Sequence, residues 1–288
     1  MTAALAAWLA LGDSASYHPM KYGGEKPLLA DGDTVYFVDF SWPRQELLAL
    51  SAYCNVVVLD HHKTAEADLA GFPNALTALW DDNPNLPMTN FDMTKSGAVL
   101  AWEFFHPEEP IPTMMLFVQD RDLWLWKYAN TKAFSAYLST KPMTLEAYRG
   151  VHLLLEAGAV DDIISIGNSL LELEAQYIKR LCDKAFLAII DGYDCMVVNA
   201  PILQSECCEE LLRRYAGYNF SAAFTREADM TTWSLRSKKD GPFDVSTIAA
   251  KFGGGGHSSA AGFKLVEEGN ISIHVDYSQE RKANVHKD

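Results

Sequence analysis

The sequence predicts an α/β fold, in which a parallel-sheet domain is joined by a long helix to a smaller mixed-sheet α/β domain. Apolar, β-branched segments at 34–39 and 56–59 flank a helical pattern at 43–53, which is the order of a βαβ unit. A helical pattern then runs almost unbroken over 144–190 before a new strand at 193–199. We therefore expect a first domain at 1–143, a helical connector at 144–190 and a second domain at 191–288.

Turn and cap signals predict the remaining elements. A first helix at 2–11 is expected to end near Gly12, and a short strand at 76–80 is expected to lead into an acidic, Pro-rich loop. Thr94 is a plausible N-cap for the next helix. Further helices are expected at 95–105, at 206–215 and at 245–252, with a helix break around Gly158 and strands at 220–224 and 231–235.

Composition limits the classes of partner. The net charge of −14 argues against broad binding to long duplex DNA, but it is compatible with a small anionic substrate held by metal ions. The apolar start of the chain lacks a basic leader region and a run near 20 residues, so no membrane segment is expected. Five cysteines without a Cys-x-x-Cys pair favour a reducing cytoplasm. The oligomeric state is not indicated.

Titratable side chains follow both strands of the predicted βαβ unit. Asp39 ends the first strand, and Asp60, His61 and His62 end the second. Each alone is more often a turn carboxylate or a satisfied histidine. Parallel neighbours finish at the same edge of a sheet, however, where α/β proteins bind ligands, and Asp and His are ligands for divalent metals. The sequence therefore predicts a metal site at this edge.

Two further carboxylates, Asp120 and Asp122, follow an apolar run that begins at Pro112. Considered alone, they are slightly better explained as a helix end paired with Arg121 or Lys127 than as metal ligands.

A glycine run at 253–256 precedes His257 and Ser258. Ordering four glycines is costly, so the run is either a flexible linker or a loop whose backbone N–H groups approach an anion. Apolar and small residues flank it, which favours the anion-binding interpretation, and Arg236 and Ser258 supply further donors. The spacing matches neither a dinucleotide-binding fingerprint nor a Walker loop.

Together, the Asp60-His61-His62 tripeptide, the earlier Asp39, the later Asp120 and the Gly254-Gly255-Gly256-His257 motif resemble the DHH phosphoesterase superfamily with a DHHA1 domain. The resemblance spans nearly the whole chain. It implies a DHH domain at 1–143, a DHHA1 substrate-binding domain at 191–288, and a metal-dependent hydrolase. The implied activity is a manganese-dependent, exonuclease-like cleavage of phosphodiester or phosphomonoester bonds in short single-stranded nucleic acids or small nucleotides.

The resemblance also implies a role for each matched residue. Asp39 corresponds to the carboxylate that bridges two Mn²⁺ or Mg²⁺ ions, and His61 and Asp120 correspond to ligands of one ion. Asp60 would support His61, while His62 would reach a substrate phosphate. The implied substrate-binding residues are Arg236, Gly254, Gly255, Gly256, His257 and Ser258.

One departure from the family pattern concerns the first motif, a strand that ends in His and Asp ligands. No such residues stand ahead of Thr2, so the ligands of one ion and one ligand of the other are missing, and we expect one ion in this chain where the family has two. Three explanations of the missing motif are equally compatible with the sequence: a shortened gene product, a true start further upstream, or a protein that has lost the motif. The alternative function is a nucleotide-binding protein that retains the phosphate-binding residues but has lost efficient catalysis.

Overall fold

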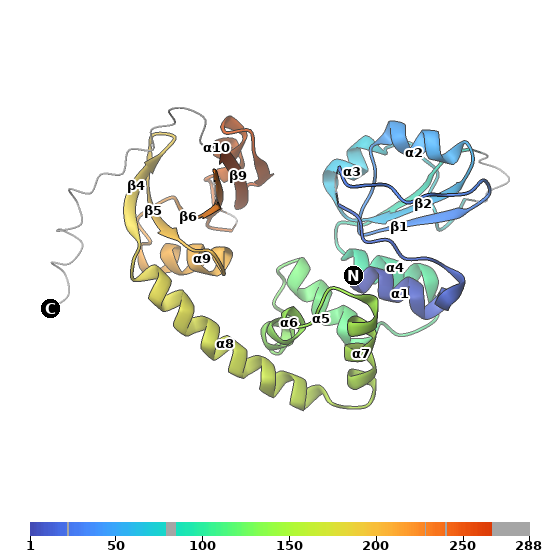
Figure 1. Ribbon diagram of the computed structural model, residues 1–288, viewed down its shortest axis with the longest axis horizontal. Coiled ribbons are helices and arrows are strands. Elements are labelled where there is room, and N and C mark those ends of the chain that lie inside the picture. Colours follow the sequence, from blue (N-terminus) through green and yellow to red (C-terminus); the bar gives the residue numbers. More distant parts are fainter. Residues whose placement is uncertain (22, 79–84, 228, 240, 267–288) are drawn as a thin grey trace. The chain divides into compact units, whose positions relative to one another are not determined.

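A computed structural model describes residues 1–21, 23–78, 85–227, 229–239 and 241–266. The chain divides into two compact units, Met1–Leu171 and Glu172 onward. Each unit is an α/β structure with its own sheet and its own hydrophobic core, which confirms the predicted fold class (Figure 1). In the described part of the chain, no helix combines the length and hydropathy of a bilayer-spanning segment.

The first unit contains a three-stranded parallel sheet in the order β1-β2-β3. The strands are β1 (Thr34–Val38), β2 (Asn55–Asp60) and β3 (Met88–Phe91). The central strand β2 is buried from Val56 to Asp60, because helices cover both faces of the sheet. The core on one face contains Val57 and Leu59, and the core on the other contains Val56 and Val58.

The helices around this sheet form two groups. On one face α1 (Thr2–Leu11) packs against α4 (Gly97–Phe105), and on the other lie α2 (Arg44–Ser51) and α3 (Lys63–Asp68) (Figure 1). A third core, centred on Leu5, Met114 and Phe134, joins α1 to the remaining helices of the unit. These are α5 (Thr113–Asp122), α6 (Thr131–Ser139), α7 (Leu145–Glu156) and the first part of α8 (Val160–Cys182).

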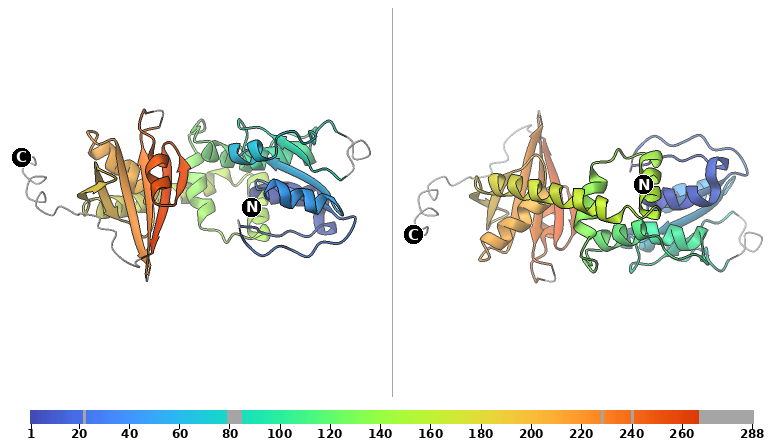
Figure 2. Two further views of the ribbon diagram at one scale, coloured as in Figure 1. Left: turned by 90° about the horizontal axis from the view of Figure 1, so that it is seen from above. Right: turned by 90° about the horizontal axis from the view of Figure 1, so that it is seen from below.

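The second unit is a six-stranded mixed sheet in the order β4-β5-β6-β7-β9-β8. Helix α9 (Gln204–Arg214) covers one face and α10 (Val245–Lys251) covers the other, as Figure 2 shows. Within this second sheet, only β5 and β6 pair in parallel among the described strands. The strands are β4 (Phe186–Ile190), β5 (Tyr193–Asn199), β6 (Phe220–Glu227), β7 (Met230–Ser237), β8 (Gly255–His257) and β9 (Ala260–Val266).

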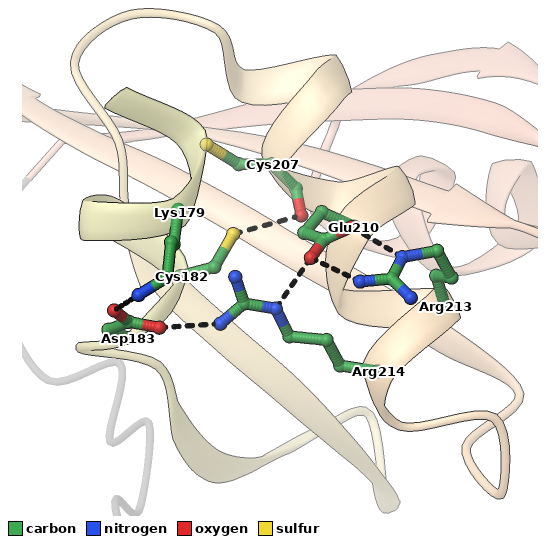
Figure 3. A network of polar contacts seen from close by, with 7 residues as sticks. All are labelled: Lys179, Cys182, Asp183, Cys207, Glu210, Arg213 and Arg214. Carbon is green, nitrogen blue, oxygen red and sulfur yellow. Dashed lines mark hydrogen bonds and ion pairs between the residues drawn. The ribbon is translucent and has the colours of Figure 1, made fainter. Parts of the chain in front are cut away.

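A polar network fastens the C-terminal end of α8 to α9 (Figure 3). Arg214 donates to Glu210 at 2.6 Å and to Asp183 at 2.8 Å, and therefore bridges the two helices. Arg213 donates to both carboxylate oxygens of Glu210, at 2.7 and 2.8 Å. Beside these pairs, the buried Cys182 thiol donates to the carbonyl oxygen of Cys207.

Several predicted elements are confirmed within one or two residues, but four expectations were wrong. Residues 76–78 lie in a turn and in irregular chain rather than in a strand, and 79–80 lie outside the described residues. The strand that completes the first sheet is instead β3, within the expected loop. Ser96, not Thr94, caps α4 by accepting from Val99 N–H. The expected helical connector ends before 190, because Phe186–Ile190 forms strand β4.

Candidate metal centre

Two parallel strand ends bring Asp39 and Asp60 together. Val38 pairs with Leu59, so Asp39 follows β1 at the level where Asp60 ends β2. The Asp39 N–H donates to the Leu59 carbonyl at 2.9 Å. Asp39 has a φ of 59°, a left-handed conformation that aspartate adopts more readily than most residues. The pairing of β1 with β2 therefore continues one residue beyond β1 and fixes the backbone of Asp39.

His61 lies between two carboxylates. Its Nε2 is 3.2 Å from Asp39 Oδ1 and 3.3 Å from Asp122 Oδ2, and Asp122 is the last residue of α5. The hydrogen bond to Asp39 raises the pKa of His61, against the effect of burial. Burial raises the pKa of Asp122, while the nearby His61 lowers it. These three side chains come from the end of β1, the end of β2 and α5, and His61 contacts both carboxylates.

Asp60 is fully buried beneath His61 and His62. Its Oδ1 accepts from the His61 backbone N–H at 2.8 Å and lies 2.7 Å from His62 Nδ1. This contact with Asp60 raises the pKa of His62. The second oxygen, Oδ2, is buried without a hydrogen-bond partner among the described residues. A buried carboxylate oxygen without a partner is costly, so its retention beside two histidines indicates a functional site.

The donor set fits a divalent metal. One potential ligand atom from each of Asp39, Asp60, His61 and His62 lies within 4.8 Å of the others. Ligands at right angles around a Mg²⁺-sized or Mn²⁺-sized ion are about 3 Å apart, close to the separations of His61 Nε2 from Asp39 and from Asp122. Carboxylate oxygens suit Mn²⁺ and Mg²⁺, and an imidazole favours the transition metal of the two.

Asp120 was expected to be a metal ligand, and the structure places it elsewhere. It is 1% exposed and accepts hydrogen bonds from Lys127 N–H at 2.7 Å, Tyr128 N–H at 3.2 Å and the Thr131 hydroxyl. Both of its carboxylate oxygens are therefore used to hold the chain that follows α5. Asp122, considered in the sequence only together with Asp120, lies beside His61 instead.

Gly97 is a residue of the site that the sequence did not indicate. It is the first residue of α4, and a Cβ at this position would collide with the Cβ and carboxylate of Asp39. The signal in the sequence was a glycine directly after a good N-cap, Ser96.

In the second unit, the last two glycines of the run form strand β8 together with His257, and this strand pairs with β9. A Cβ at Gly254 would meet the Gly262 carbonyl and Phe263, and a Cβ at Gly256 would meet Ala260 and Ala261. Gly256 also has a φ of 143°. A Cβ at Gly255, by contrast, would meet nothing within 4 Å. Close strand pairing therefore accounts for Gly254 and Gly256, while Gly255 has open space above it.

Strand register brings Arg236 and His257 into one row across the second sheet. Arg236 pairs with Ala260, and Ala260 pairs with His257, so the three side chains lie on the same face. Arg236 donates to the Ser205 hydroxyl at 2.7 Å and to the Leu235 carbonyl at 2.8 Å, which fixes its guanidinium. His257 and Ser258 are exposed. Only the methyl group of Ala260 stands between Arg236 and His257 in this row.

Comparison with known proteins found a curated relative and several similar folds. No family model matches the chain. An uncharacterised protein, R106 of Acanthamoeba polyphaga mimivirus, is 31% identical over 235 residues, which cover 79% of this chain and 52% of the relative. The chain thus spans about half the length of that protein.

Similar solved structures include DHH-domain proteins. A DHH domain assigned to a family of ribosomal proteins has a TM-score of 0.49 at 14% identity, covering 97% of this chain and 72% of that one. The pGpG-specific phosphodiesterase PggH from Vibrio cholerae has a TM-score of 0.48 at 13% identity, covering 98% and 94%. RecJ in complex with Mn²⁺ from Thermus thermophilus has a TM-score of 0.44 at 16% identity, covering 82% and 42%.

Proposed function

We propose that this chain is a member of the DHH phosphoesterase superfamily, a metal-dependent hydrolase of phosphodiester or phosphomonoester bonds in short single-stranded nucleic acids or small nucleotides. The single observation that carries the proposal is the convergence of Asp39, His61 and Asp122. They come from three separate elements, and His61 Nε2 lies 3.2 and 3.3 Å from the two carboxylates. The motif order along the sequence supports the same assignment.

Asp39, His61 and Asp122 would hold a Mn²⁺ or Mg²⁺ ion. When bound, such an ion supplies a water molecule of lowered pKa and polarises a phosphoryl oxygen. Asp122 takes the ligand position that the sequence assigned to Asp120. His61 must be neutral to bind a metal, whereas without the metal its contact with Asp39 favours the protonated ring. Metal binding at this site is therefore expected to release a proton.

Asp60 and His62 would act beside the ligands. Asp60 accepts from the His61 backbone and contacts His62 Nδ1, and so it fixes both residues without touching the substrate. The His62 side chain is 46% exposed, and its Nε2 remains available to donate to a phosphate oxygen. The raised pKa of His62 favours the protonated ring, which suits that role.

The second unit would bind the substrate phosphate through the Arg236–Ala260–His257 row. Arg236 is held by Ser205, while His257 and Ser258 are exposed next to the open position of Gly255. A fixed guanidinium and an exposed imidazole on one face of a sheet, with a small residue between them, form a suitable surface for a phosphate.

The test is release of product from four substrates: short single-stranded RNA, short single-stranded DNA, a cyclic dinucleotide and a nucleoside bisphosphate. The proposal predicts turnover with Mn²⁺, loss of turnover with a chelator, and loss in both His61→Ala and Asp122→Asn. The exposed Asp161→Asn on α8 serves as a control of equal charge change and is expected to match the wild type. Binding of nucleotides without metal-dependent turnover would instead establish the alternative, a nucleotide-binding protein.

A further inference from the structure

Three aromatic rings are presented to solvent directly after α5. Trp124 is 43% exposed and Tyr128 is 36% exposed, and Trp126 is partly exposed between them. The Trp124 and Trp126 rings meet edge to face, with centroids 5.3 Å apart. We call Trp124, Trp126 and Tyr128 the ring surface. Large aromatic side chains exposed together are uncommon on a protein surface and mark binding sites.

The backbone beneath the ring surface is strained. Trp124 and Trp126 have φ values of 53° and 52°, in a region that bulky side chains rarely adopt. Asp120 holds this conformation, because its carboxylate accepts from the Lys127 and Tyr128 N–H groups and its carbonyl accepts from Leu125 N–H. Such strain persists only where surrounding contacts enforce it, and it concentrates at functional sites. Asp120 is therefore a positioning residue for the rings.

The ring surface begins two residues after the metal centre. Asp122 Oδ2 lies 3.3 Å from His61 Nε2, and two residues of chain span at most about 7 Å. A substrate whose phosphoryl group lies against Asp122 and His61 thus has its next chemical group near Trp124. In a nucleotide, that group is the sugar and its base.

Positive charge accompanies the rings. Lys132 Nζ is 5.1 Å from the Trp126 ring centroid, and Lys127 Nζ is 5.7 Å from the Tyr128 centroid. In a chain of net charge −14, these two lysines make the ring surface locally favourable for an anion. Aromatic rings interleaved with cations are the pattern by which proteins bind single-stranded nucleic acid, since every base can stack on a ring.

We propose that the ring surface is a base-stacking platform, on which the Trp124 ring stacks against the base of the nucleotide whose phosphoryl group lies at the metal centre. This inference rests on the proposed function and adds to it a binding site for the base. The substrates are phosphoesters that carry a nucleobase, not inorganic polyphosphates or base-free sugar phosphates. Asp120 contributes by fixing the loop rather than by binding metal.

The first test compares a dinucleotide with its abasic analogue, in which one base is replaced by hydrogen. Trp124→Ala should raise KM for the dinucleotide about 5- to 150-fold, the loss expected for one stacked base, and leave KM for the abasic analogue unchanged. Trp124→Phe keeps a ring and should restore most of the affinity. Leu125→Ala, in the same loop and 55% exposed, is the matched control and should behave as the wild type.

A second measurement separates this inference from the proposed function. Binding of a mononucleotide in the presence of a chelator, followed by tryptophan fluorescence, should weaken in Trp124→Ala and recover in Trp124→Phe. If that pattern holds while no substrate is hydrolysed, the platform stands and the hydrolase assignment fails. If hydrolysis occurs but Trp124→Ala affects the dinucleotide and the abasic analogue equally, the platform is overturned and the hydrolase assignment stands.

Discussion

Gly97 and Asp39 lie in direct contact, so that any side chain at residue 97 would occupy the space of the Asp39 carboxylate. Gly97 opens α4, whose first turn therefore adjoins the metal centre, and Asp39 holds its left-handed backbone through the hydrogen bond to Leu59. The position of the carboxylate is thus fixed from two sides, by the sheet and by a helix. Because of this double constraint, a substitution at Gly97 tests the geometry of the metal site as directly as a substitution of a ligand does.

Gly97→Ala should therefore displace Asp39 and weaken Mn²⁺ binding by at least about tenfold, and overpacking should lower the free energy of unfolding by about 1–3 kcal/mol. Calorimetric titration with Mn²⁺ and urea unfolding measure the two effects. Gly150→Ala on α7 is the control: its Cβ meets nothing, and alanine in a helix interior should leave stability unchanged or raise it by up to about 1 kcal/mol. Equal Mn²⁺ affinity in both variants would contradict the site geometry.

Asp120 and Asp122 should respond in opposite ways to conversion to asparagine. Asp122→Asn removes a charged ligand and should abolish Mn²⁺ binding with little effect on stability. Asp120→Asn replaces one carboxylate oxygen by an NH₂ group, which cannot accept the hydrogen bonds from Lys127 N–H, Tyr128 N–H or the Thr131 hydroxyl. It should lower the free energy of unfolding by about 1–3 kcal/mol while Mn²⁺ binding persists. Calorimetry and urea unfolding on both variants measure this. The reverse pattern would restore Asp120 as the ligand.

The network between α8 and α9 should make stability depend on pH. Hydrogen bonds from Arg213, and then from Arg214, lower the pKa of Glu210 to about 2. The pKa of Asp183 shifts in the same direction, through Lys179 and Arg214. Because these pKa values are lower in the folded than in the unfolded chain, the stabilisation is complete above about pH 4.5 and is lost as the pH falls toward 2.

Urea unfolding of Glu210→Gln, followed by circular dichroism from pH 6 to pH 2, should accordingly show a flatter loss of stability than the wild type. Glu172→Gln, an exposed position on α8, provides a control of equal charge change. Parallel pH profiles for wild type and Glu210→Gln would mean that the ion pairs seen in Figure 3 contribute nothing measurable.

The glycine run and His257 can be tested separately. If His257 donates to a phosphate, His257→Ala should weaken nucleotide binding about 10- to 150-fold, the range for a hydrogen bond to a charged group, and leave the unfolding midpoint unchanged. Gly255→Ala should fold normally, since its Cβ has open space, and should weaken binding only if the backbone there approaches the ligand.

Gly256→Val, whose Cβ would meet Ala260 and Ala261, should destabilise the second unit instead. Unchanged nucleotide affinity in both His257→Ala and Gly255→Ala would contradict phosphate binding here. The glycine run would then serve only to pair β8 with β9.

The sequence was a good guide where the determinants of structure are local. Asp39 and His61 could be predicted to lie together because parallel strands end at one edge. The choice between Asp120 and Asp122 could not, because residues two apart near a helix end point to nearly opposite sides and only packing decides which faces His61. Strand β3 was missed for a related reason: Met88–Phe91 is four residues long, and its pairing with β2, rather than its composition, makes it a strand. Strand β4 is a short apolar run that periodicity alone cannot distinguish from helix.

The five buried thiols give the chain a set of internal reporters. Cys54 belongs to the first unit, and Cys182, Cys195, Cys207 and Cys208 belong to the second. Burial raises the pKa of Cys195 and raises that of Cys208 to about 12, so these thiols are protonated as well as shielded while the unit is closed. An alkylating reagent therefore modifies them only during transient opening, and mass spectrometry can time the opening of each unit within one molecule. Ligand binding to one unit would then be read out as slower labelling of its own cysteines.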